Sequence, residues 1–211
     1  MVFTSNSIDV SGLFVKTSGI LMDYITDAQI KEIVDRVAKS LQSDAATIAA
    51  NSLTHSHPLQ PGKNVAIGSD HGGFCLKEKL KAYLVELGYT VIDCGTHSED
   101  SVDYPDYALK VAEKVATQSA WRGIMIDGAG IGSCMVANKV AGVRAAMCYD
   151  YATAVNSREH NDANLLTLGA GLIGLNQAKL IVKTWLETDF GGGRHAPRVA
   201  KIMAIEKQSA K

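Results

Sequence analysis

The 211-residue chain lacks the features that mark several classes of protein. Its 21 Lys and Arg residues nearly balance its 22 Asp and Glu residues, and only 6% of its residues are aromatic. The chain therefore has neither the basic stripe nor the stacking surface typical of a nucleic-acid-binding protein. No stretch approaches the roughly 18 apolar residues of a membrane span. These absences favour a globular protein that binds small ligands, among which small phosphates stay possible.

Cysteine is scarce as well, and a signal peptide is not recognisable. The four cysteines form no Cys-x-x-Cys pair; they are Cys75, Cys94, Cys134 and Cys148. A chain of this length can build a core without disulfides, so reduced thiols are expected. Asp9 and Asp23 interrupt the N-terminus, which has no basic segment followed by an apolar one. We therefore expect a cytoplasmic protein.

The sequence predicts an N-terminal extension, residues 1–62, followed by an α/β domain, residues 63–211. Within the extension, apolar residues recur at helical spacing over Asp27–Leu41, which predicts a short amphipathic helix. Residues 42–62 have no apolar period and contain Pro58 and Pro61, so they are interpreted as a linker.

The second region alternates short Val/Ile/Leu runs with longer helical patterns. Strands are expected at Val65–Ser69, Thr90–Asp93, Gly123–Ile126, Val143–Met147 and Leu165–Leu168. Strands that alternate with crossover helices predict a Rossmann-like, doubly wound parallel sheet of five strands with helices on both faces. Ligands of such folds bind beyond the carboxyl ends of the strands.

Polar residues follow two of these strands. Asp70 and His71 come directly after the first strand, where they could hold a hydroxyl and an anion. Asp127 ends the third strand and precedes three alternating glycines, Gly128, Gly130 and Gly132. Backbone N–H groups of such a loop can surround a ligand oxygen, and a carboxylate beside them could act as a base. The alternative is that both carboxylates only cap helices.

Further candidates follow the fourth strand and the helix predicted at Gln177–Leu186. His160 stands at a predicted helix end, where a structural or solvated role is the common alternative. Arg194 and Arg198 lie four residues apart, a spacing that suits a phosphate clamp or a solvated surface. The whole set suits proton transfer on a small phosphorylated substrate. A Gly-x-Gly-x-x-Gly match at 169–174 has no further strand–helix unit after it, so no nicotinamide cofactor is expected.

Several of these segments together resemble ribose-5-phosphate isomerase type B and the galactose-6-phosphate isomerase subunits. The resemblance spans residues 64–206. It rests on Ile67–Phe74, Asp103–Pro105, the glycine loop with the Ala137–Lys139 segment, Ser157–Asp162 and Gly192–Val199.

The resemblance implies a metal-independent aldose–ketose isomerase that works through an enediolate. It implies that Asp70 binds sugar hydroxyls and that His160 helps to open the sugar ring. His71, Arg194 and Arg198 would then hold the phosphate. Asn161 and Tyr104 would line the pocket. It also implies a homodimer or homotetramer with sites shared between subunits, and no cofactor or metal.

The chain departs from the family pattern at the third strand end. The family usually has Cys-Gly-Thr/Ser there, with the cysteine as the base, whereas this chain has Asp127-Gly128-Ala129. We expect Asp127 to act as the base. Ribose 5-phosphate is expected to be a poor substrate, and a different phosphorylated sugar could be the true one. The alternative is a phosphosugar-binding or structural relative that has lost catalysis.

The predicted N-terminal helix resembles the peptides that tether enzymes inside bacterial microcompartments. An isolated helix of this length is marginal until its apolar stripe is buried, so docking to a shell protein would stabilise it. Packing on its own domain and a role in oligomerisation stay open as alternatives.

Overall fold

The structure is a computed structural model that describes residues 28, 30–32, 34–36 and 63–209. The two units of the chain divide at residues 57 and 58. In the first unit, the described residues are helical, in agreement with part of the helix expected at 27–41. The rest of that helix and the expected linker, residues 42–62, lie outside the described residues.

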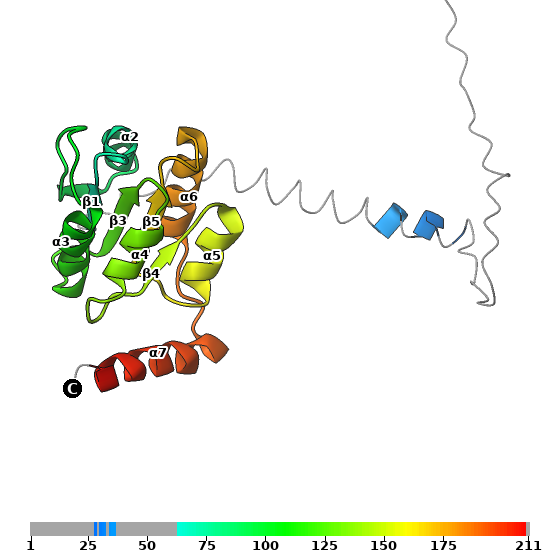
Figure 1. The fold of residues 1–211 in the computed structure, drawn as a ribbon. Helices are drawn as coiled ribbons and strands as arrows, with labels where there is room; N and C mark the ends of the chain where they lie inside the picture. Colours follow the sequence, from blue (N-terminus) through cyan, green and yellow to red (C-terminus); the bar gives the residue numbers. More distant parts are fainter. Residues whose placement is uncertain (1–27, 29, 33, 37–62, 210–211) are drawn as a thin grey trace, which may run out of the picture. The chain divides into compact units, whose positions relative to one another are not determined.

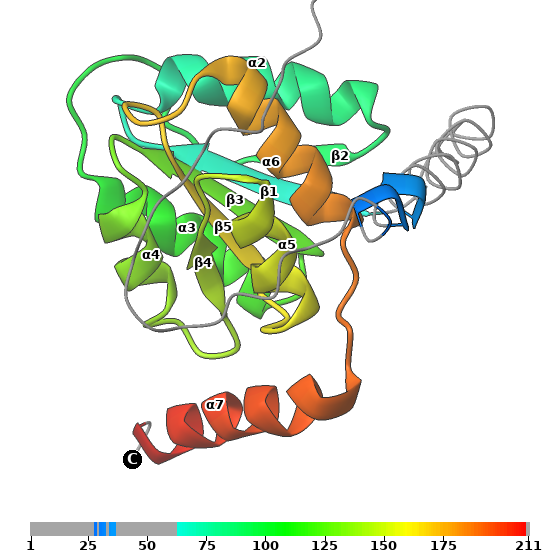
Figure 2. The same cartoon turned by 90° about the vertical axis from the view of Figure 1, so that its right-hand side faces the viewer.

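The second unit contains a five-stranded parallel sheet with strand order β2-β1-β3-β5-β4. Its strands are β1 (Asn64–Ser69), β2 (Thr90–Asp93), β3 (Arg122–Asp127), β4 (Ala145–Met147) and β5 (Leu165–Gly169). The helices are α2 (Phe74–Glu86), α3 (Tyr104–Ala116), α4 (Ile131–Ala137), α5 (Tyr151–Glu159), α6 (Leu175–Glu187), the 3₁₀ turn η1 (Gly193–His195) and α7 (Ala196–Ser209). Figures 1 and 2 show this arrangement. The predicted fold is confirmed.

Alternating residues of the central strands build two separate cores. Val65 and Ile67 of β1 point to the face that α2, α5 and α6 cover, where Trp185 is fully buried. Ala66 of the same strand points to the opposite face, against Val111 of α3. Because both faces are covered, the middle of β1 and of β3 is continuously apolar, and polar residues stand only at the ends of these two strands.

Strand β4 is shorter than the Val143–Met147 strand that the sequence predicts. Two asparagine side chains replace the missing backbone pairing. Asn164 accepts a hydrogen bond from the Arg144 N–H at 2.7 Å, and Asn138 bonds both the N–H and the carbonyl of Ala145 at 2.9 Å. Asn138 thus bonds the backbone of Ala145, whereas Asn164, which immediately precedes β5, bonds Arg144 between the two strands. No helix among the described residues is long and apolar enough to cross a membrane.

Candidate functional site

The carboxyl edge of the sheet brings together four of the predicted site segments. Asp70 and His71 lie in the loop between β1 and α2, Tyr104 begins α3, and Asp127 ends β3 before the glycine loop. The Asp70 N–H donates to the Ile126 carbonyl at 3.2 Å, which holds the first and third loops side by side. Asp70 and Asp127 are buried, whereas His71, Tyr104 and Gly128 are exposed. The two carboxylates therefore lie at the buried base of the site, and the exposed residues surround its opening.

Asp70 and His71 are both fixed by backbone groups. One Asp70 carboxylate oxygen accepts the Gly73 N–H at 3.0 Å, at the start of α2. The Val102 N–H lies 3.2 Å from Nδ1 of His71, and the Val102 carbonyl lies 3.1 Å from it. When Nδ1 accepts from Val102, Nε2 carries the ring hydrogen and faces outward as a donor. Asp70 therefore bonds the turn before α2 but does not cap the helix, whose N-cap is Gly73. Its second carboxylate oxygen accepts no hydrogen bond from the described residues.

Tyr104 packs directly on the glycine loop. A Cβ added to Gly132 would lie 2.6 Å from the Tyr104 ring, closer than any side chain can approach. Only glycine at residue 132 allows this contact, so the loop and the aromatic ring form one surface. Gly128 differs, since a Cβ there would meet nothing within 4 Å.

The Asp127 carboxylate is turned into its own loop. One oxygen accepts the backbone N–H groups of Ala129, at 2.8 Å, and of Gly130. The other accepts the backbone N–H of Ser133, at 3.1 Å, and the Ser133 hydroxyl. The side chain is 4% exposed. The loop donors that the sequence suggested for a ligand oxygen therefore bind the Asp127 carboxylate in this structure.

The remaining predicted residues lie at the opposite edge of the sheet. Helix α5 begins just after the carboxyl end of β4 and ends just before the amino end of β5. His160 and Asn161 follow the end of α5, so they lie at the amino edge. The η1 turn and the start of α7, which carry Arg194 and Arg198, lie at the same end of α5 (Figure 1). One chain therefore does not bring these residues to Asp70 and Asp127.

At this amino edge, His160 is held on two sides. Its Nδ1 lies 2.8 Å from the side-chain nitrogen of Asn156, one helical turn earlier. Its ring stacks on the ring of His195 with centroids 4.1 Å apart and an interplanar angle of 7°. Arg194 and Arg198 are exposed, and among the described residues neither forms an ion pair. They are therefore available to an external anion.

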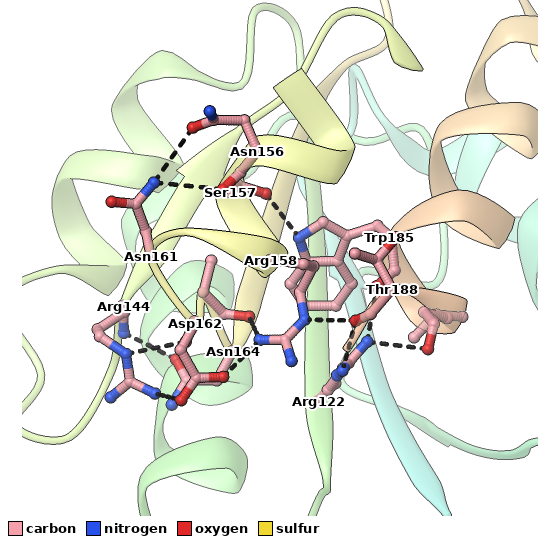
Figure 3. Close-up of polar contacts among 12 residues, drawn as sticks. Arg122, Arg144, Asn156, Ser157, Arg158, Asn161, Asp162, Asn164, Trp185 and Thr188 are labelled. Carbon is pink, nitrogen blue, oxygen red and sulfur yellow. Dashed lines mark hydrogen bonds and ion pairs between the residues drawn. The ribbon is translucent and has the colours of Figure 1, made fainter. Parts of the chain in front are cut away.

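A buried polar network supports the turn that carries His160 and Asn161 (Figure 3). The Asp162 carboxylate forms ion pairs with Arg158, at 2.9 Å, and with Arg144, at 3.0 Å. Arg158 also donates to the Thr188 carbonyl at 3.2 Å, which ties the end of α5 to the end of α6. Because the network joins three segments, the turn has little freedom to move.

The sequence analysis did not single out Ser133, Asn156 or His195. Asn156 precedes His160 by four residues, a spacing that places the two on one helix face and could have indicated their contact. The contacts of Ser133 and His195 depend on how the chain folds back after a strand or helix, and no local pattern indicates them.

The structure is a parallel α/β protein in which the predicted site residues lie at both ends of the strands. We call Asp70 and Asp127, at the carboxyl edge, the acidic set, and His160, Arg194 and Arg198, at the amino edge, the basic set. The profile of the ribose/galactose isomerase family matches residues 65–202. The chain belongs to this family, and residues 1–64 precede the matched region.

Individual relatives agree with this assignment. Over 146 residues, the chain is 48% identical to ribose-5-phosphate isomerase B of Escherichia coli, covering 69% of this chain and 98% of that protein. It is 41% identical to D-erythrulose-4-phosphate isomerase of Pectobacterium atrosepticum, covering 69% and 96%. The solved structure of ribose-5-phosphate isomerase B from Clostridium thermocellum has 54% identity and a TM-score of 0.68, covering 69% and 99%. These relatives are sugar-phosphate isomerases.

Proposed function

We propose that this chain interconverts the aldose and ketose forms of a phosphorylated sugar through an enediolate, without a metal or cofactor. The observation that carries the proposal is the pairing of two complementary sets of residues. Buried carboxylates lie at one edge of the fold and unpaired guanidinium groups lie at the other. Guanidinium groups suit a phosphate, and carboxylates suit hydroxyl binding and proton transfer. Two of the relatives named above differ in the sugar phosphate in their names, so the substrate is proposed only as a class.

The roles of the residues follow the chemistry of the reaction. His160 takes a proton from the C1 hydroxyl of the cyclic sugar and delivers one to the ring oxygen, which breaks the bond between C1 and that oxygen. Asp127 then removes the C2 proton to form the enediolate and delivers a proton to C1, while a second proton passes from O2 to O1 through solvent. Asp70 binds sugar hydroxyls, while His71 and the two arginines hold the phosphate. Tyr104, Asn161 and the glycine loop, Gly128, Gly130 and Gly132, line the pocket.

We further propose that each site forms between two copies of the chain. In one chain the acidic and basic sets lie at opposite sheet edges, so one copy cannot hold one small sugar with both. A groove of about 660 Å³ supports the pairing, because it lies at the amino edge between the β4 region and α7. Its lining includes Ile202, which is 46% exposed and offers apolar surface that a second copy could cover. A homodimer is the simplest assembly, and a homotetramer repeats it.

Mixed assemblies test the shared site. Asp127→Asn inactivates the acidic set of a chain, and His160→Gln inactivates the basic set. When both variants are unfolded and refolded together, random pairing gives about a quarter of the wild-type activity, because half of the dimers contain one intact site of two. Circular dichroism checks that both variants are folded. If the folded mixture then recovers no activity, each site lies within one chain.

Solvent exchange tests the isomerase itself. The full chain is incubated with a panel of pentose, hexose and tetrose phosphates in deuterated water, and deuterium at C1 and C2 is followed by NMR. We expect incorporation into at least one of these sugars. If none of them acquires deuterium, the chain is not an isomerase of this kind.

A catalytically impaired phosphosugar-binding protein is the second candidate. The geometry of Asp127 favours it, because four donors of its own loop already satisfy that carboxylate. Thermal stabilisation by a sugar phosphate without deuterium incorporation would identify this function.

For the N-terminal extension we propose a tether to a microcompartment shell protein. Ile30 and Val34 support it, since they lie one turn apart on the helix and are 50% and 57% exposed. Deletion of residues 1–60 is expected to leave sugar-phosphate binding intact and to abolish co-purification with shell proteins. Co-purification that survives the deletion would exclude the tether.

A further inference from the structure

His195 and His160 form the only stacked pair of imidazole rings in the described part of the chain. Their centroids lie 4.1 Å apart, and the two planes are within 7° of parallel. The rings come from segments 35 positions apart in sequence, one at the end of α5 and the other in η1. This contact therefore depends on the path of the chain after α6.

Backbone contacts hold η1 against the end of α5. The Gly191 N–H donates to the Glu159 carbonyl at 2.9 Å. A Cβ at Gly191 would lie 3.2 Å from that same carbonyl, so the two segments touch closely. The His195 N–H donates to the Gly192 carbonyl at 2.9 Å, which closes the turn. These contacts fix the backbone of His195 beside the end of α5.

The contacts of His195 favour a neutral ring. Arg194 Nε donates to Nε2 of His195 at 3.4 Å, so this nitrogen acts as an acceptor. Burial, followed by the nearby His160, Arg194 and Arg198, lowers the pKa of His195, whereas Glu159 opposes the shift. These four residues are the charged and titratable groups that face the ring from α5, η1 and α7.

The contacts of His160 leave one nitrogen for chemistry. Asn156 occupies its Nδ1, and His195 covers one face of the ring. The nearest carboxylate to Nε2 is that of Glu159, at 4.0 Å, beyond hydrogen-bonding distance. Nε2 can therefore reach a substrate, provided that the ring stays in its plane.

We propose that His195 is a positioning residue for ring opening: its stacked imidazole keeps the His160 ring in the plane in which Nε2 reaches the sugar. The inference rests on the proposed isomerase function and adds a residue to it. His195 does not need to touch the substrate. Stacking between flat rings is sensitive to shape more than to charge, so an aromatic replacement is expected to keep the effect.

Two substrates of the same reaction distinguish a role in ring opening from a general structural role, because only the aldose has a ring to open. Ribose 5-phosphate is mainly a ring that must open before its C2 proton moves. Ribulose 5-phosphate has no free C5 hydroxyl and cannot close a five-membered ring. Exchange of its C1 protons with deuterated water therefore needs enediolate formation and no ring opening.

The experiment compares wild type, His195→Ala and His195→Phe in both assays. We expect His195→Ala to slow the isomerisation of ribose 5-phosphate about threefold to tenfold, the effect of losing one ring stack. Its rate of C1 exchange in ribulose 5-phosphate is expected to equal that of wild type, and His195→Phe is expected to recover most of the loss. Equal loss in both assays, or loss in neither, would overturn the positioning role.

A second measurement is independent of activity. In wild type, the stacked His195 ring is expected to shift the NMR signal of the His160 Cε1 hydrogen upfield. That shift is expected to disappear in His195→Ala and to persist in His195→Phe; an unchanged signal in His195→Ala would show that the rings do not stack. If wild type exchanges neither pentose phosphate, the proposed function fails for pentoses, while this measurement still decides whether the ring pair exists.

Discussion

Replacement of Asp127 by asparagine tests both the structure and the proposed chemistry of the acidic set. Asparagine keeps the shape and one acceptor oxygen, so Ala129 and Gly130 can still donate to it. Its amide nitrogen, however, would face the Ser133 N–H, a donor against a donor. A buried N–H without a partner costs about 1–3 kcal/mol, and the remaining bonds lose their charge assistance.

The expected loss in the free energy of unfolding is therefore about 2–4 kcal/mol. For a domain of this size, that corresponds to a fall in Tm of roughly 5–15 °C. Removal of a general base is expected to slow deuterium exchange about 10²- to 10⁴-fold. Both values are measured on the purified full chain, by thermal denaturation and by NMR in deuterated water.

Ser133→Ala is the matched control, because it removes one hydrogen bond to the same carboxylate and leaves the carboxylate in place. We expect a loss of about 1 kcal/mol in stability and persistent exchange. Exchange at the wild-type rate in folded Asp127→Asn would refute Asp127 as the base. An unchanged Tm in that variant would refute the hydrogen bonds described above.

Three further predictions follow from other parts of the structure. Gly132→Ala places a Cβ 2.6 Å from the Tyr104 ring, so it should weaken sugar-phosphate binding in calorimetry and cost about 1–3 kcal/mol in stability. Gly174→Ala is the control, because open space surrounds its Cβ, and it should bind normally; equal binding by both variants would contradict the packing. Arg198→Gln should raise KM about 10- to 100-fold, because it removes a charge-assisted contact to the phosphate. The control is Lys201→Gln, at another exposed cation, which should leave KM unchanged. The same KM for both variants would exclude the phosphate clamp. Burial alone would raise the pKa of Asp93, but hydrogen bonds from Lys81, the Gly95 N–H and the buried Lys77 hold it at about 2, below its usual 3.8. Because the folded-state pKa is the lower one, this stabilisation is complete above about pH 5 and is lost as pH falls toward 2. In urea denaturation at pH 7, Asp93→Asn should be less stable than wild type by about 2–4 kcal/mol. This difference in the free energy of unfolding should shrink between about pH 5 and 2. A difference that does not change with pH would contradict the low pKa of Asp93.

The fold could be predicted because its signals are local. Buried runs such as Val65–Ser69 mark the strands of a covered parallel sheet, and the helices between them fix the parallel direction. The start of β4 was misplaced because the side chains of Asn164 and Asn138 bond the backbone of Arg144 and Ala145, and a sequence pattern does not show such long-range contacts.

The candidate site could be predicted only in part. Asp70 follows β1 and Asp127 ends β3, and these strands are parallel neighbours, so the shared edge of the two residues follows from the topology. The sequence analysis grouped His160 with them, although a helix that follows a strand returns the chain to the amino edge. The inward turn of Asp127 depends on Gly130, whose φ of +79° folds the loop back over the carboxylate. The contact between His160 and His195 depends on tertiary packing alone.

A crystal structure of the full chain with a bound sugar phosphate is the most direct test of the proposed site. We expect the phosphate to contact Arg194 and Arg198 of one copy of the chain, with C1 and C2 of the sugar beside Asp127 of a second copy. A sugar phosphate bound wholly within one chain, or with C2 remote from Asp127, would contradict this arrangement.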